Sequence, residues 1–135
     1  MKHLIQSTLI VLISVGMFSC SNGQDTAKSV AIAENVNVDD FASRLEGSQI
    51  LDVRTPEEWS QGIIEGAVMM NFYDNDFDDQ LAKLDKEKPV AVYCKSGGRS
   101  GNAMSKMNTM GFKEVYNLNG GMGAWKGAGK PTTNP

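Results

Sequence analysis

Short apolar runs alternate with amphipathic segments along most of the chain, and short polar or glycine-containing turns separate them. Four apolar runs have the length and composition of β-strands, at residues 50–54, 67–71, 90–93 and 115–118. We expect the runs at 67–71 and 90–93 to be buried. Helical patterns follow at residues 74–84, 102–110 and 122–125. This alternation predicts an α/β domain whose mostly parallel sheet carries helices on both faces.

The segment before these strands predicts a short edge strand and a short helix. Val36 and Val38 are the apolar positions of the edge strand. Asp39 or Asp40 can then cap a helix that Gly47 ends. A carboxylate accepts hydrogen bonds from the free N–H groups at a helix start, and glycine tolerates the left-handed backbone at a helix end.

A strong helix start follows the strand at residues 50–54. Thr55 has the properties of an N-cap, Pro56 fits the first helical position, and Glu58 completes a capping box. Arg54 and Glu58 lie across this helix start, so we interpret them as a structural ion pair rather than as catalytic groups. Asp52 either orients a nearby site or caps the adjacent turn. Asp52, Arg54 and Glu58 are therefore candidate supporting residues.

The first nineteen residues have the regions of a secretory signal peptide in their usual order. A positive start precedes the mostly apolar stretch from Leu4 to Phe18, which is too short and too polar for a good membrane span. Its end resembles the lipobox of bacterial lipoproteins, in which Cys20 would be lipidated and become the new N-terminus. Ordinary signal cleavage near Cys20 stays open as the alternative. We expect an exported, periplasmic protein that is lipid-anchored to a bacterial membrane.

These boundaries define the expected domain organisation. At 135 residues the chain has room for one domain of ordinary size. We expect a signal peptide at 1–19, an anchor cysteine and flexible tether at 20–34, the folded domain at 35–130 and a tail at 131–135.

Composition narrows the chemistry of the mature protein. His3 is the only histidine and lies in the predicted signal peptide, so Cys–His pairs, Ser–His pairs and a His-ligated zinc site are excluded. The formal net charge is −3 and no run of Lys or Arg occurs, which argues against nucleic-acid binding. We expect no metal and no cofactor, and we expect a monomer.

Cys94 stands where a predicted buried strand ends and a small-residue loop leads into a helix. At such a junction backbone N–H groups converge on the sulfur and the helix dipole favours the anion, so the thiol pKa falls. We therefore expect Cys94 to be a catalytic nucleophile. The alternative interpretation is an inert buried thiol. If Cys20 is lipidated, Cys94 is the single free thiol and no intramolecular disulfide can form.

Four segments of the chain resemble, in order, the motifs of the rhodanese-like domain family: residues 52–67, 90–100, 111–118 and 120–125. The first begins Asp-Val-Arg and ends Gly-Ile-Ile-Glu-Gly-Ala, the second holds the Cys94 loop, and the last is Gly-Gly-Met-Gly-Ala-Trp. The likeness covers residues 35–126. Ile63 stands where the family usually has a histidine, and we interpret this difference as a structural variation.

The resemblance implies the three-layer rhodanese fold and sulfur transfer. Cys94 would carry a sulfane sulfur as a persulfide, taken from thiosulfate or a persulfide donor and passed to cyanide or a thiol. The loop would bind the substrate through six residues: Lys95, Ser96, Gly97, Gly98, Arg99 and Ser100. Gly97 and Gly98 would let the loop wrap closely. Lys95 and Arg99 would add positive charge for an anionic donor.

Two other functions stay open. Four residues separate Cys94 from Arg99, one fewer than in the phosphate loop of protein tyrosine phosphatases. This shorter loop favours sulfur transfer over phosphatase or arsenate reductase chemistry. The second alternative is a non-catalytic module of the rhodanese fold that carries sulfur or contacts another protein. Inactive family members usually lack the loop cysteine, so Cys94 favours the enzyme.

Overall fold

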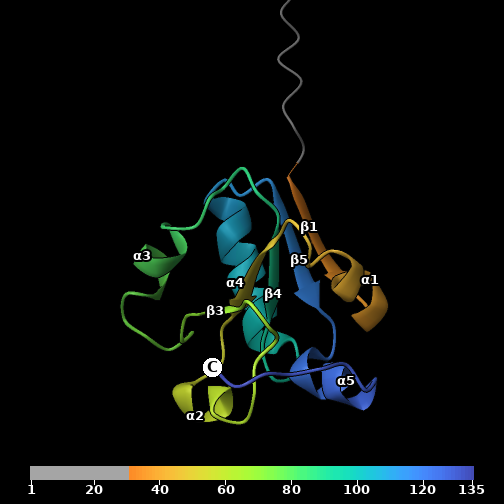
Figure 1. Cartoon of the computed structure of the whole chain (residues 1–135). Coiled ribbons are helices and arrows are strands. Elements are labelled where there is room, and N and C mark those ends of the chain that lie inside the picture. The colour runs from red at the N-terminus through yellow and green to blue at the C-terminus, as the bar shows by residue number, and fades with distance from the viewer. Residues whose placement is uncertain (1–30) are drawn as a thin grey trace, which may run out of the picture.

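The computed structural model describes residues 31–135 (Figure 1), and the predicted signal peptide, Cys20 and most of the predicted tether lie outside the described residues. The strands form one five-stranded parallel sheet in the order β1-β5-β4-β2-β3. They are β1 (Ile32–Val36), β2 (Gln49–Asp52), β3 (Val68–Met69), β4 (Val90–Tyr93) and β5 (Glu114–Leu118). The helices are α1 (Val38–Ser43), α2 (Pro56–Trp59), α3 (Phe77–Leu81), α4 (Gly98–Thr109) and α5 (Gly121–Gly127). The predicted α/β fold with a parallel sheet is confirmed.

Helices cover both faces of the sheet, and the side chains of its central strand alternate between two hydrophobic cores. Val90 and Val92 of β4 belong to a core shared with α3 and α4. Ala91 and Tyr93 belong to a second core shared with α1 and α5. All four side chains are 0% exposed, because β4 is central and packed on both faces. The buried strand predicted at residues 90–93 is confirmed.

The carboxyl ends of the parallel strands lie together at one edge of the sheet. The register pairs Asp52 at the end of β2 with Tyr93 at the end of β4. The segments that follow these strands therefore leave the sheet side by side, which is where open α/β sheets bind ligands. Figure 1 shows α2 and α5 at this end of the molecule.

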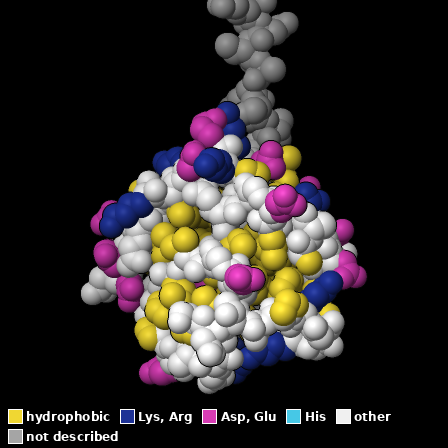
Figure 2. Space-filling model, viewed as in Figure 1, with side chains coloured by type: hydrophobic (Ala, Val, Ile, Leu, Met, Phe, Trp, Pro, Cys, Tyr) yellow, Lys and Arg dark blue, Asp and Glu magenta, His cyan; other side chains and the backbone are white. Residues whose placement is uncertain are grey.

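The apolar run at residues 67–71, predicted to be a buried strand, forms only the two-residue edge strand β3. Val68 and Met69 are 46% and 37% exposed, because β3 pairs with β2 alone. The prediction that this strand is buried is wrong. Figure 2 shows hydrophobic side chains at the surface on this view, interspersed with acidic and basic ones.

The predicted start of the domain also needs correction. Val38, expected in the edge strand, is the first residue of α1, and β1 lies earlier in the chain. Asn37 caps α1, because its side chain accepts a hydrogen bond from the Asp40 N–H at 2.9 Å. The N-caps predicted at Asp39 or Asp40 are therefore wrong. An amide oxygen one position before the first helical residue takes that role.

Three other helices differ in how well the sequence predicted their bounds. α2 begins as predicted, with Thr55 as the N-cap and Pro56 in the first turn. The helix predicted at 74–84 is shorter, since α3 covers only Phe77–Leu81. The helix predicted at 102–110 begins earlier, at the start of α4. Gly97 has a φ of +100° and turns the chain directly from the Cys94 loop into this helix.

Part of the predicted C-terminal tail lies against the domain. Ile63 and Thr133 form an antiparallel bridge, in which each N–H donates to the other's carbonyl oxygen at 2.8 and 2.9 Å. Trp125 Nε1 donates to the Pro131 carbonyl oxygen at 2.8 Å. Within residues 31–135, no helix has the length and apolar character to cross a membrane.

Candidate active site

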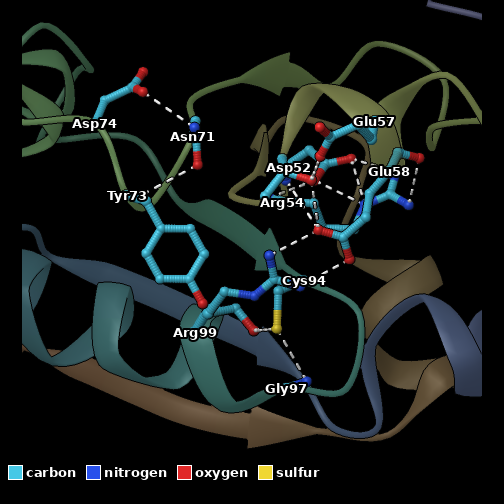
Figure 3. Close-up of polar contacts among 12 residues, drawn as sticks. Asp52, Arg54, Glu57, Glu58, Asn71, Tyr73, Asp74, Cys94, Gly97 and Arg99 are labelled. Atoms are coloured by element: carbon cyan, nitrogen blue, oxygen red, sulfur yellow. Dashed lines mark hydrogen bonds and ion pairs between the residues drawn. The ribbon is translucent and has the colours of Figure 1, made fainter.

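Cys94 directly follows β4, and its side chain is 0% exposed. Its Sγ accepts hydrogen bonds from the Gly97 N–H at 3.1 Å and from the Ser100 hydroxyl at 3.3 Å (Figure 3). The loop can fold over the sulfur because Gly97 adopts a left-handed backbone that side chains disfavour. The strand, the loop and the first turn of α4 thus place hydrogen-bond donors around one sulfur atom.

Opposing effects act on the pKa of the Cys94 thiol. Burial is the largest single effect and raises the pKa, whereas the Ser100 hydroxyl and the N–H groups of Ser100, Ser96 and Gly97 lower it. Together these hydrogen bonds outweigh burial, and the pKa lies below its ordinary value. The N-terminus of α4 adds the positive end of a helix dipole on the same side. These groups therefore stabilise the thiolate, and none of them is a histidine.

The N-terminus of α5 holds the backbone of the Cys94 loop. The Met122 N–H donates to the Cys94 carbonyl oxygen at 2.8 Å, and the Gly123 N–H donates to the Lys95 carbonyl oxygen at 3.1 Å. Gly121 allows this close approach, because a Cβ at this position would lie 2.5 Å from the Cys94 carbonyl oxygen. Gly121 and Gly123 of the motif at 120–125 therefore contact the backbone of the Cys94 loop directly.

Asn117 holds the loop from the side of the sheet. It lies in β5 and is 3% exposed. Its Nδ2 donates to the Gly97 carbonyl oxygen at 3.1 Å and to Asn35 Oδ1 at 2.8 Å. The sequence analysis missed this residue. The available signal was a polar residue within the apolar run at 115–118, since a buried amide needs partners.

Arg99 and Glu58 form a bidentate ion pair at the site. Arg99 Nη1 and Nη2 each donate to a Glu58 carboxylate oxygen at 2.8 Å (Figure 3). Arg99, followed by hydrogen bonds from Thr55, lowers the pKa of Glu58 to about 2 against the effect of burial, so the carboxylate is charged at neutral pH. The predicted ion pair between Arg54 and Glu58 is wrong. Arg99 as a ligand for an anionic donor stays a prediction.

Arg54 pairs instead with Asp52, and both side chains are almost fully buried. Arg54 Nη2 donates to Asp52 Oδ2 at 2.7 Å and to the Gly62 carbonyl oxygen at 2.7 Å. Arg54 Nη1 also donates to the backbone carbonyl of Glu58 at 3.1 Å. This buried pair fixes α2 and the turn after it against the end of β2. It supports the position of Glu58 and does not touch the Cys94 sulfur.

The remaining loop side chains differ in exposure. Lys95, Ser96 and Gly98 are exposed, whereas Ser100 is buried beside the sulfur. A cavity of about 210 Å³ opens next to the loop, lined by Arg54, Glu58, Gln61, Lys95, Met122, Gly123 and Lys126.

Within residues 31–135, no group of three His, Cys, Asp or Glu side chains comes together to hold a metal ion.

Two further side chains at the site were not singled out from the sequence. Lys126 lies on α5 and lines the cavity. Tyr73 is 66% exposed, and the centre of its ring lies 5.8 Å from the Arg99 guanidinium carbon. No local pattern marks either residue, because each reaches the site only through the packing of distant segments.

The family profile of the rhodanese-like domain matches residues 37–128. The chain belongs to this family. Its rhodanese-like domain has Ile63 buried at 5% exposure and paired with Thr133, at the position where histidine is usual. The structure thus shows a buried apolar side chain in place of the histidine, on a residue whose backbone forms a strand-like bridge with Thr133.

Several relatives of the rhodanese-like domain carry the name sulfurtransferase. It is 37% identical over 98 residues to thiosulfate sulfurtransferase 16, chloroplastic, of Arabidopsis thaliana, covering 65% of this chain and 82% of that protein. It is 29% identical over 107 residues to a sulfurtransferase of Allochromatium vinosum, covering 77% and 98%. The polysulfide-sulfur transferase homodimer of Wolinella succinogenes is a similar solved structure, with 31% identity, a TM-score of 0.64 and coverage of 81% of this chain and 82% of that chain. The predicted family and fold are confirmed.

Proposed function

We propose that the protein transfers a sulfane sulfur through a persulfide on Cys94. The observation that carries this proposal is the set of donors around the Cys94 sulfur, from Gly97, Ser100 and Ser96, which lower the thiol pKa. The same donors suit a terminal persulfide anion, which also needs hydrogen bonds in place of water. The names of the relatives support the same class of reaction.

In the first step the Cys94 thiolate attacks the outer sulfur of thiosulfate. A bond forms between Cys94 Sγ and that sulfur, and the sulfur–sulfur bond within thiosulfate breaks. Sulfite leaves with the bonding electron pair. A thiolate and a dianion become a persulfide anion and a dianion, so atoms and charge balance without an external oxidant. No proton transfer is required, which fits a site that lacks histidine.

In the second step an acceptor takes the outer sulfur. Cyanide or a thiolate attacks it, the bond to Cys94 Sγ breaks, and the electron pair returns to Sγ as the thiolate. The products are thiocyanate or a new persulfide. The N-terminus of α4 favours the anion on Cys94 before and after both steps.

Sulfite release tests this proposal. The parent protein should release sulfite from thiosulfate when cyanide is present, and Cys94→Ser should release none above background. Ser105→Ala is the control, because Ser105 is exposed on the same helix and bonds only the Gly101 carbonyl among its described contacts. If Cys94→Ser releases as much sulfite as an active parent, Cys94 is not the nucleophile. If the parent itself releases none above background, the protein is instead a non-catalytic module.

We also propose that the protein is exported and anchored by a lipid on Cys20. The support is the order of the first twenty residues, with a positive start, an apolar stretch and then this cysteine. Cys20→Ala should move the protein from the membrane fraction to the soluble fraction. Cys94→Ser is the matched control and should stay with the membrane. Unchanged fractionation of Cys20→Ala would contradict the anchor.

A further inference from the structure

The two arginines at the site are both held by carboxylates. Arg99 gives its two Nη groups to Glu58, and Arg54 gives Nε and Nη2 to Asp52. Arg54 uses all three of its side-chain nitrogens in these bonds and in bonds to the backbone carbonyls of Glu58 and Gly62. Arg99 uses the end of its guanidinium formed by Nη1 and Nη2, and Glu58 offsets its charge, so a sulfur donor meets only its remaining N–H groups.

Two lysines at the same cavity have no such partner. Lys95 directly follows Cys94, and Lys126 lies on α5 at the wall of the cavity. In the part of the chain that the structure describes, neither ammonium forms an ion pair, and the one hydrogen bond of Lys126 Nζ goes to the Gln61 carbonyl at 3.3 Å. Free positive charge at the cavity therefore belongs to these lysines.

We propose that Glu58 is a specificity-determining residue. Its carboxylate occupies the Nη1 and Nη2 end of Arg99 and offsets the charge of that guanidinium, which weakens the attraction of Arg99 for the donor. Lys95 and Lys126 then attract the anionic part of the donor. This inference rests on the proposed sulfur transfer and concerns which donors the Cys94 thiolate meets. Glu58 disfavours a compact dianion such as thiosulfate relative to a persulfide whose organic group is uncharged, since it adds negative charge beside the cavity.

Glu58→Gln isolates this effect. Glutamine keeps the length of the side chain and an oxygen that can accept from the Thr55 N–H, but it removes the charge that holds Arg99. The ratio of kcat/KM for thiosulfate to kcat/KM for an alkyl persulfide with an uncharged organic group should rise by about fivefold, the scale of one partly exposed ion pair. Glu57→Gln is the matched control, because it removes the same charge from α2 at an exposed position without a contact to Arg99.

Lys126→Gln gives an independent test that leaves the interior untouched, since Lys126 is exposed. Its kcat/KM for thiosulfate should fall by about fivefold, and the dependence on ionic strength should weaken. Lys88→Gln is the charge-matched control, because Lys88 precedes β4 at the opposite end of the strand from Cys94.

Separate outcomes contradict separate claims. If Glu58→Gln leaves the donor ratio where Glu57→Gln leaves it, or Lys126→Gln matches Lys88→Gln, this inference is wrong although Cys94 still accepts sulfur. If the parent accepts sulfur from neither donor, the proposed sulfur transfer is wrong, and the inference about Glu58 is then wrong as well. Thermal melting of each variant checks that a changed ratio does not come from unfolding.

Discussion

At the scale of single residues, the Cys94 sulfur lies in a buried position that hydrogen bonds make favourable for an anion. Burial alone would raise the pKa of the thiol, but Ser100, Ser96 and Gly97 reverse that effect. Ser100 contributes most among them, through its hydroxyl and its N–H. Reactivity therefore depends on a few polar contacts in an otherwise apolar core.

Ser100→Ala should raise the pKa of Cys94. The lost hydroxyl favoured the thiolate, so its removal leaves less thiolate at a given pH, and the midpoint for alkylation should move upward by about one pH unit. The rate of iodoacetamide alkylation against pH measures this midpoint, and Ser105→Ala is the control on the same helix. An unchanged midpoint in Ser100→Ala would show that the hydroxyl does not act on the sulfur.

Sequence spacing located Cys94 and its donors but gave the wrong partner for Glu58. The cysteine, the glycines and Ser100 lie within residues 94–100, so their convergence follows from the local backbone geometry of the loop and the first turn of α4. Arg99 is 41 positions from Glu58, and their contact depends on how α2 and α4 sit around the sheet edge. Arg54 is nearer to Glu58 in the sequence than Arg99 is, but Arg54 forms its ion pair with the buried Asp52.

At the scale of elements, the loop between β4 and α4 is held from two sides. The N-terminus of α5 bonds the carbonyls of Cys94 and Lys95, and Asn117 of β5 bonds the carbonyl of Gly97. These contacts come from elements that lie later in the chain than the loop itself. The geometry of the Cys94 loop therefore depends on complete folding of the C-terminal part of the domain.

Gly121→Ala should disturb this support. The new Cβ would lie 2.5 Å from the Cys94 carbonyl oxygen, and the position has a φ of +57°. We expect the free energy of unfolding to fall by about 2 kcal/mol or more, with loss of sulfite release. Urea denaturation measures the change. Gly127→Ala, with no atom within 4 Å of its Cβ, is the control, and equal stability of the two variants would contradict the close packing.

Asp52→Ala should destabilise the junction of β2 and α2 strongly. It leaves the Arg54 guanidinium buried without its carboxylate, and breaking a buried pair from one side costs about 3 kcal/mol or more. Thermal and urea denaturation check the result. Asp79→Ala removes an exposed carboxylate from α3 and should change stability little. Stability of Asp52→Ala close to that of Asp79→Ala would contradict a structural role for the pair.

The central elements could be predicted from the sequence better than the edge elements. The run at 90–93 is apolar because both faces of β4 are covered. Its pattern therefore predicts a buried strand. The run at 67–71 is equally apolar, but the strand order places β3 at an edge, where only Met70 just after it is buried. Strand order is a property of the whole sheet, and no local pattern encodes it.

At the scale of the whole molecule, the parallel arrangement explains why the site lies where it does. All strand ends that carry site residues meet at one edge, so the turn after β2, the loop after β4 and the start of α5 surround one cavity. The C-terminal residues close the fold beside this edge, where Thr133 pairs with Ile63 and Pro131 accepts from Trp125.

Removal of residues 131–135 should therefore lower stability. The deletion breaks the two bridge hydrogen bonds and the Trp125 contact, and at about 1 kcal/mol each the loss should be about 2–3 kcal/mol. Urea denaturation measures the change. Removal of 134–135 alone keeps all three contacts and is the control. If the longer deletion is as stable as the shorter one, the tail does not support the domain.

Intact-protein mass spectrometry after incubation with thiosulfate tests the central claim most directly. The account predicts that the parent protein gains the mass of one sulfur atom, that cyanide removes this mass, and that Cys94→Ser gains none under the same conditions. The account would be contradicted if the parent gained no sulfur, or if Cys94→Ser gained the same mass as the parent.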